Sequence, residues 1–147
     1  MEQKIREFIE ILRRKGYKVT PQRVELFKII KTSKHPTAEE VYQKVKADYP
    51  TVSPATVYKT IELLRSMGEV QEIGVINGKV RYETNTNPHI NIHCLICGDI
   101  EDIFSEKIKE SINDIASRSD YKIISQNYNF YGYCPKCQKK LSEKSQE

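Results

Sequence analysis

The chain has 147 residues, of which 38% are hydrophobic and 30% are charged, as in a soluble globular protein of one ordinary domain or two small ones. No apolar run reaches the roughly 20 residues of a membrane span, and the N-terminus lacks the apolar core of a secretion signal, so we expect a cytoplasmic protein. Residues 1–83 hold 16 basic and 11 acidic residues and residues 84–147 hold 8 and 9, and the basic half suggests either a nucleic-acid partner or an ordinary solvated surface.

Helix signals dominate the first half of the chain. Apolar residues recur at helical spacing, and each of the last three predicted helices begins after a serine or threonine that can cap it. In two of these helices a proline follows at the first helical position, and the third has a capping box. The predicted helices cover about residues 4–15, 21–34, 37–49 and 54–67.

The pattern changes after the fourth helix. Residues 70–76 and 79–83 are strand-like and are joined by Asn77-Gly78, a strong two-residue hairpin turn. Helices followed by a hairpin predict a winged helix-turn-helix, in which residues 54–67 form the recognition helix and the hairpin forms the wing.

Small, hydroxyl-bearing and basic side chains near the start of the predicted recognition helix suit contacts with DNA phosphates and bases. A lysine in the loop between the first two helices could reach a minor groove or a phosphate. The candidate DNA contacts are Lys18, Ser53, Ala55, Thr56, Tyr58 and Lys59. The alternatives are that Tyr58 packs in the core and that Lys18 is simply solvated.

The second half predicts a small α/β domain. We expect an α+β protein with a winged-helix domain at residues 1–83, a hinge at 84–88 and a dimerisation and zinc-binding domain at 89–147. The last part is expected to form a strand near residue 100, a helix after Ser105 and a strand within 121–133, with a frayed tail over the last ten residues. It has few apolar residues, so it should need zinc and a second copy of itself for stability.

The only cysteines of the chain form two Cys-x-x-Cys pairs, Cys94 with Cys97 and Cys134 with Cys137. A tetrahedral zinc ion takes four thiolates, and two such pairs supply them from distant points of the chain. Two disulfides or four free thiols are the alternatives, but a two-residue spacer and a reducing cytoplasm suit a metal better. The pattern therefore predicts a structural zinc site.

All three histidines, His35, His89 and His93, lie near breaks in the pattern. Most surface histidines are only solvated, but two carboxylates accompany these: Glu83 ends the wing and Asp102 follows the first cysteine pair. Mixed histidine and carboxylate ligands suit iron, manganese or zinc. His89 and His93 would lie about 13 Å apart in an extended segment and could not share one ion without a bend. We therefore predict a second metal site on His35, Glu83, His89 and Asp102, which come from both halves of the chain.

Three further segments carry a family resemblance: GYKVTPQR at 16–23, HPTAEEVY at 35–42 and ATVYKT at 55–60. With the cysteine pairs, they resemble the ferric uptake regulator family of metal-dependent transcription factors, and within it the peroxide-sensing branch. The resemblance implies a homodimer that reads AT-rich palindromic operators in double-stranded DNA. It also implies a structural zinc on the four cysteines and a regulatory metal, Fe(II) or Mn(II), at the hinge.

Carried over by position, the regulatory ligands would be His35, Glu83, His89, Asn91 and Asp102. Asp102 matches the peroxide-sensing branch, in which iron beside the histidines catalyses their oxidation and DNA is released. His35 and His89 occupy the two oxidisable positions. Two residues depart from the pattern: Glu83 stands where that branch typically has aspartate, and Asn91 stands where the family usually has histidine. An asparagine offers only a neutral carbonyl oxygen, which is a weak ligand.

These observations support four hypotheses about function. The first is a repressor of metal-homeostasis or peroxide-stress genes whose DNA affinity depends on the hinge metal. The second, motivated by Asn91, is an iron or manganese uptake regulator without peroxide sensing. The third is a zinc-stabilised DNA-binding module with no metal switch, and the fourth is a small metallo-hydrolase. We do not expect an enzyme, because the four-cysteine set leaves no open coordination position.

Overall fold

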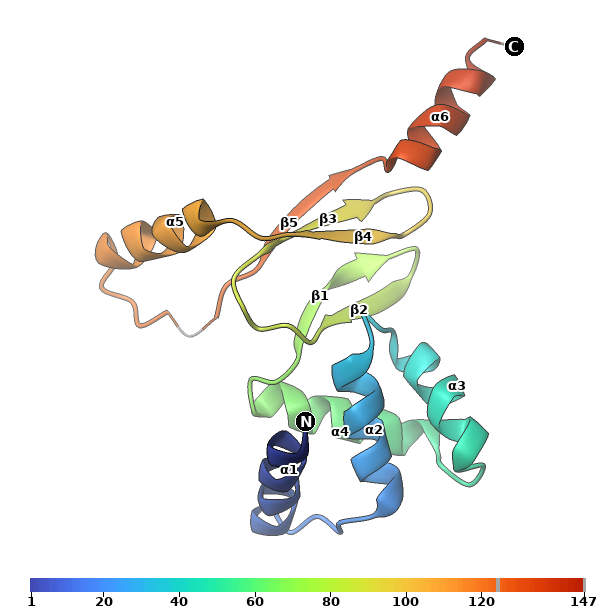
Figure 1. Ribbon diagram of the computed structural model, residues 1–147, viewed down its shortest axis with the longest axis vertical. Helices are drawn as coiled ribbons and strands as arrows, with labels where there is room; N and C mark the ends of the chain where they lie inside the picture. The colour runs from blue at the N-terminus through green and yellow to red at the C-terminus, as the bar shows by residue number, and fades with distance from the viewer. Residues whose placement is uncertain (124, 147) are drawn as a thin grey trace. The chain divides into compact units, whose positions relative to one another are not determined.

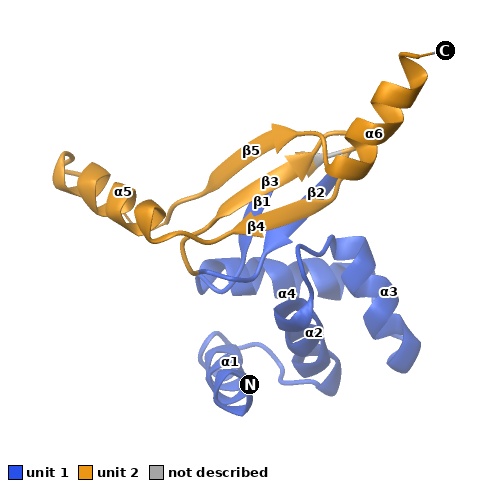
Figure 2. Cartoon of the chain, turned by 45° about the horizontal axis from the view of Figure 1, so that its top comes forward, with its two compact units in different colours: residues 1–74, 79–86 blue, residues 75–78, 87–147 orange. Residues whose placement is uncertain are grey.

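The computed structural model describes residues 1–123 and 125–146, which fold into two compact units (Figures 1 and 2). Unit 1 comprises residues 1–74 and 79–86, and unit 2 comprises residues 75–78 and 87–147. Unit 1 is mainly helical and unit 2 combines strands and helices, so the predicted α+β class is confirmed. In the described part of the chain, no helix has the length and apolar character that crossing a membrane requires.

Four helices form most of unit 1 (Figure 1). They are α1 (Glu2–Arg14), α2 (Pro21–Thr32), α3 (Ala38–Asp48) and α4 (Pro54–Ser66). The hydroxyls of Thr20, Thr37 and Ser53 accept hydrogen bonds from amides in the first turns of α2, α3 and α4. Glu40 completes a capping box with Thr37. All four predicted helices are therefore present, and so are the three predicted caps of α2, α3 and α4.

A two-stranded sheet follows the helices. It pairs β1 (Gln71–Ile76) with β2 (Lys79–Glu83). Asn77 and Gly78 join the strands with φ angles of 53° and 74°. Both angles are positive, as the favoured two-residue hairpin turn requires, and the predicted wing is confirmed.

The core of unit 1 lies among its helices. The rings of Phe8 in α1 and Phe27 in α2 stack with their centroids 4.7 Å apart. On α4, Val57 and Ile61 are at most 1% exposed, whereas Tyr58 is 56% exposed. One face of α4 is therefore fixed to the core while the opposite face carries side chains that can contact a partner.

Unit 2 is built on a three-stranded sheet in the order β4-β3-β5. Its strands are β3 (Ile90–Cys94), β4 (Ile100–Ile103) and β5 (Tyr128–Gly132), and its helices are α5 (Glu106–Ser117) and α6 (Pro135–Lys144). Strand β3 pairs antiparallel with β4 and parallel with β5. The parallel pairing brings segments from the two ends of unit 2 side by side.

Three expectations for the second half were wrong or incomplete. Residues 90–94 form a central strand that the sequence pattern did not single out as an element. The strand expected within 121–133 is confined to Tyr128–Gly132, and Ile124 in that range lies outside the described residues. Much of the expected frayed tail belongs to α6, because Pro135 starts a helix there and Cys137 anchors its first turn with 4% exposure.

Unit 2 buries few apolar side chains of its own. Apart from cysteines, Ile108 is the only residue of α5 or α6 counted in the described core. Aromatic side chains are instead exposed on the sheet and around it, with Phe104 at 55%, Phe130 at 57% and Tyr131 at 56%. Such a unit gains little stability from its core, as the composition predicted.

Replacement of Thr20 by alanine should lower the free energy of unfolding by about 1 kcal/mol, because the Arg23 amide loses the hydroxyl that lies 3.3 Å away. Thr20→Ser keeps the hydroxyl and should retain most of the stability. Urea denaturation followed by far-ultraviolet circular dichroism measures both variants. Equal stability of the alanine variant and the unsubstituted protein would contradict the assignment of Thr20 as a cap.

Candidate metal centres and DNA-binding face

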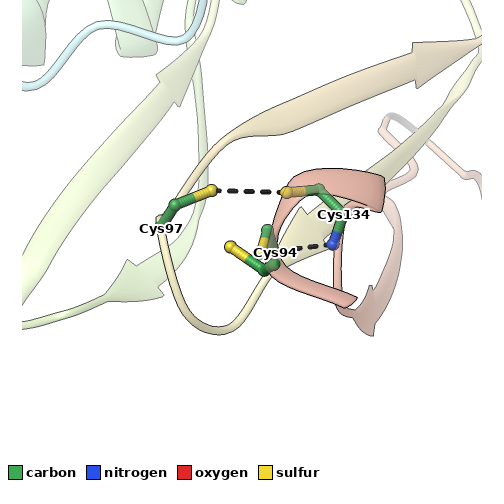
Figure 3. Close-up of side chains that lie close together, drawn as sticks. Cys94, Cys97 and Cys134 are labelled. Carbon is green, nitrogen blue, oxygen red and sulfur yellow. Dashed lines mark hydrogen bonds between the residues drawn. The ribbon is translucent and has the colours of Figure 1, made fainter. Parts of the chain in front are cut away.

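Four cysteine sulfurs converge in unit 2. Figure 3 shows Cys94, Cys97 and Cys134 of this group. Cys94 ends β3, Cys97 lies in the turn that follows, Cys134 is the N-cap of α6, and Cys137 lies in its first turn. Their sulfur atoms all lie within 4.8 Å of one another. Parallel pairing places Cys94 opposite Gly132, which brings the start of α6 beside the first cysteine pair.

The spacing of the sulfurs distinguishes a metal site from a pair of disulfides. A disulfide requires an S–S distance of about 2.05 Å. All four cysteines are free, and Sγ of Cys97 lies 3.7 Å from Sγ of Cys134 (Figure 3). Thiolates at the corners of a tetrahedron with Zn–S bonds of about 2.3 Å lie about 3.8 Å apart. The cluster therefore fits one zinc ion with all four positions filled by the protein.

The surroundings of the sulfurs explain why they require a cation. The backbone N–H of Cys134 donates to Sγ of Cys94 at 3.3 Å, and this bond, with those from nearby amides, lowers the pKa of Cys94 to about 6. Burial and the neighbouring sulfurs instead raise the pKa of Cys137 to about 12. Four thiols this close repel one another once ionised, so a divalent cation is needed to hold them all as thiolates.

Unit 1 contains one buried histidine–carboxylate pair. His35 lies in the loop between α2 and α3, Glu83 ends β2, and their side chains are 5% and 7% exposed. Nε2 of His35 lies 3.2 Å from Oε2 of Glu83, and the Asn85 amide donates to Oε1 of Glu83 at 2.6 Å. Carboxylates are rarely buried this far unless they are paired or bind a metal, so this pair is a candidate half of a metal site.

Unit 2 contains a second pair of the same kind. Nε2 of His89 lies 3.9 Å from Oδ1 of Asp102, and the His89 ring stacks on Phe104 with centroids 4.9 Å apart. Nδ1 of His89 lies 2.6 Å from the Asn87 carbonyl, which can only accept, so Nδ1 carries the proton in the neutral ring. The unprotonated Nε2 is then the atom suited to a metal. Asn91, 2% exposed, lies opposite Asp102 in the antiparallel register.

The predicted regulatory ligands are divided between the two units. His35 and Glu83 belong to unit 1, whereas His89, Asn91 and Asp102 belong to unit 2. Each pair combines an imidazole nitrogen with a carboxylate oxygen, a ligand mixture that fits Fe(II), Mn(II) or Zn(II).

His93, whose role the sequence left open, is fully buried in unit 2. Its Nε2 lies 2.7 Å from Oδ1 of Asn129, and its ring stacks on Tyr131 with centroids 5.1 Å apart. Both partners lie on β5, so His93 ties the central strand to its parallel neighbour.

Four of the six predicted DNA-contacting residues lie together in unit 1, and the other two are exposed on α4. Lys18, Ser53, Thr56 and Lys59 line a single depression, and Ala55 and Tyr58 are exposed on the same helix. The alternative that Tyr58 packs in the core is wrong, because its side chain is 56% exposed.

Arg23 also lines this depression, and sequence reasoning missed it. Its Nη1 donates to the Lys18 carbonyl at 2.6 Å, and its guanidinium lies 5.3 Å from the centre of the Tyr17 ring. Arg23 therefore fixes the loop that carries Lys18. Its place in the same motif, GYKVTPQR, was the available signal.

Replacement of Cys137 by serine should remove zinc and loosen unit 2, because a hydroxyl is a poor substitute for a thiolate and the unit has little apolar core. Elemental analysis should show less than one zinc per chain, and amide signals of β3 and β5 should lose dispersion in NMR spectra. Ser142→Ala on the same helix is the control and should retain full zinc. Normal zinc content in the serine variant would rule out Cys137 as a ligand.

Comparisons with known proteins place the chain in a family. The profile of the ferric uptake regulator family matches residues 14–131. The peroxide-responsive repressor PerR of Staphylococcus aureus (strain USA300) is 32% identical over 141 residues, 95% of each chain. The structure of the Campylobacter jejuni peroxide stress regulator is 34% identical, with a TM-score of 0.70 over 88% of this chain and 98% of that chain. A structure of the Francisella tularensis ferric uptake regulator with iron is 31% identical, with a TM-score of 0.66 over 84% and 96%. The chain therefore belongs to the ferric uptake regulator family.

Proposed function

We propose that the protein is a metal-dependent transcriptional repressor that acts in the cytoplasm and binds DNA as a homodimer. One Fe(II) or Mn(II) ion would be held jointly by the two histidine–carboxylate pairs and Asn91. The observation that carries this proposal is the division of the pairs, since each unit contains a buried imidazole beside a buried or half-buried carboxylate. Neither pair alone offers enough ligands for a regulatory ion, so binding would require both units.

The division of ligands supplies the switch. A ligand can shift a conformational equilibrium only by binding one arrangement more tightly than another. An ion shared between the pairs would favour the arrangement of units that brings His35 and Glu83 together with His89 and Asp102. A dimeric helix-turn-helix protein must present its two recognition helices at a fixed half-site spacing, so this restriction would raise DNA affinity.

The DNA-binding face and the exposed sheet of unit 2 support the remaining parts of the proposal. The depression lined by Lys18, Arg23 and Lys59 is basic and includes the start of α4, which suits contacts with DNA phosphates. The AT-rich palindromic operator is proposed from the family resemblance alone. The exposed Phe130 and Tyr131 on β5 are suited to burial against a second copy of the chain.

We further propose that the repressor responds to peroxide, as the name of the Staphylococcus aureus relative states for that protein. When bound, Fe(II) would supply the reaction with peroxide that oxidises a neighbouring imidazole. His35 and His89 are the candidates, because each places Nε2 beside a carboxylate of the same ligand set. An oxidised imidazole would no longer serve as a ligand, and the restriction on the units would be lost.

Operator binding should strengthen about 10- to 100-fold when Mn(II), or Fe(II) under anaerobic conditions, is added to the zinc-loaded protein. The operator can be obtained by in vitro selection from random duplexes, and fluorescence anisotropy then gives the Kd with and without metal. His89→Ala should keep its zinc but lose the metal dependence, because the pair with Asp102 is broken. DNA affinity that is indifferent to metal in the unsubstituted protein would refute the switch.

Peroxide sensing separates this proposal from a second candidate, an iron or manganese uptake regulator without redox chemistry. Asn91 favours the second candidate, since a neutral amide oxygen replaces the usual imidazole. The similarity to the Francisella tularensis ferric uptake regulator is of the same order as that to the peroxide regulators.

Mass spectrometry of tryptic peptides distinguishes the two candidates. For the peroxide sensor, the Fe(II) form exposed to peroxide should gain one oxygen atom on the peptide of His35 or His89, and its operator should be released. The Mn(II) form is the control and should gain none. Unmodified histidines with retained metal-dependent DNA binding would favour the uptake regulator.

A further inference from the structure

His35 has a backbone conformation that most residues avoid. Its φ angle is 45°, in the left-handed region. Among the described residues 1–123 and 125–146, Asn77 is the only other non-glycine residue with a positive φ, and the hairpin turn accounts for that one. Surrounding structure must impose such a conformation, so the contacts that hold the His35 backbone are informative.

Arg81 provides one of these contacts from β2. Its Nη1 donates to the His35 carbonyl at 3.1 Å, and the adjacent Tyr82 amide donates to the Pro36 carbonyl at 3.0 Å. The same Nη1 lies 3.2 Å and 3.1 Å from the two carboxylate oxygens of Glu40. The guanidinium thus joins the strained loop to the first turn of α3.

Glu40 is itself held in place by the start of α3. Its Oε2 accepts a hydrogen bond from the Thr37 amide at 2.9 Å, and its own amide donates to the Thr37 hydroxyl at 3.1 Å. Burial alone would raise the pKa of Glu40, but the Thr37 amide and Arg81 lower it, so Glu40 is a stable anionic anchor. A series of hydrogen bonds therefore connects Thr37 to Glu40, Glu40 to Arg81, and Arg81 to the carbonyl of His35.

Strand β2 contacts both the backbone and the side chain of His35. Arg81 and Glu83 are two residues apart and so lie on the same face of the strand. Arg81 binds the His35 carbonyl, whereas Glu83 lies 3.2 Å from Nε2 of its ring. This arrangement fixes the backbone and the side chain of His35 relative to the carboxylate that shares the candidate metal site.

We propose that Arg81 is a positioning residue for the regulatory metal site, although it is not a ligand. Anchored by Glu40, it holds His35 in its left-handed conformation and so directs Nε2 toward the ion before the ion binds. This inference rests on the proposed function, because it assumes that His35 is a ligand. Groups that orient metal ligands typically change affinity by about 10- to 100-fold when removed.

Arg81→Met is the direct test, with Lys79→Met as the matched control. Lys79 is an exposed residue on the same strand, so both variants lose one positive charge and gain the same side chain. The measurement is the Kd for Mn(II) of the full-length, zinc-loaded protein. Arg81→Met should bind Mn(II) about 10- to 100-fold more weakly, Lys79→Met should bind normally, and Arg81→Lys, which lacks the forked guanidinium, should recover only part of the affinity.

Two further readouts separate positioning from loss of fold. The Arg81–Glu40 ion pair is partly exposed, with side-chain exposures of 24% and 50%, so its removal should leave zinc content and the unfolding midpoint nearly unchanged. The imidazole ¹⁵N signals of His35 should shift in the metal-free variant, because the ring is no longer held beside Glu83. Mn(II) affinity equal to that of the unsubstituted protein would overturn the inference.

The failure of this inference can be told apart from failure of the proposed function. If His35→Ala and His89→Ala weaken Mn(II) binding but Arg81→Met does not, only the role of Arg81 is wrong. If neither histidine variant changes Mn(II) binding, the regulatory site itself is wrong.

Discussion

The pairing of β3 with its two neighbours positions the candidate metal ligands of unit 2. Its antiparallel register with β4 sets Asn91 opposite Asp102, and its parallel register with β5 sets Cys94 opposite Gly132, just before the second cysteine pair. Side chains alternate along a strand, so Asn91 and Cys94 point to opposite faces of the sheet. A slip of one residue would reverse these faces and separate the cysteine pairs. One strand thus contributes residues to two candidate metal centres and places those residues on opposite faces of the sheet.

The two candidate centres differ in ligand chemistry as well as in position. Four thiolates form a soft, closed set, which suits zinc and leaves no position for exchange. The histidine–carboxylate pairs are harder and suit Fe(II) or Mn(II). In the proposed arrangement, an ion at the second site would exchange while zinc at the first maintains the fold of unit 2, which has few buried apolar side chains. Stability and regulation are assigned to different metals.

Local signals account for what the sequence predicted correctly. The helix caps and the Asn77-Gly78 turn depend on residues at most three apart, and the zinc ligands are apparent from their spacing. The parallel pairing of β3 with β5 depends on residues far apart in a loosely alternating segment, so no local pattern indicated it. The hydrogen bond from Arg81 to His35 spans 46 positions of the chain. The sequence therefore predicted the candidate metal ligands, but not the contacts that hold them in place.

Asn91 stands where the family usually has histidine, and this difference makes the contacts that hold His35 more important. In a site where an imidazole is replaced by a neutral amide oxygen, the ion gains less from its ligands, so less free energy is available to order them. A histidine that had to enter a left-handed backbone conformation on binding would use part of that gain. Here the conformation is already imposed in unit 1 by Arg81 and Glu40, and the paired carboxylate lies 3.2 Å from the ring. In the proposed site, a preorganised His35 would therefore let a weaker ligand set bind an ion tightly enough to act as a switch.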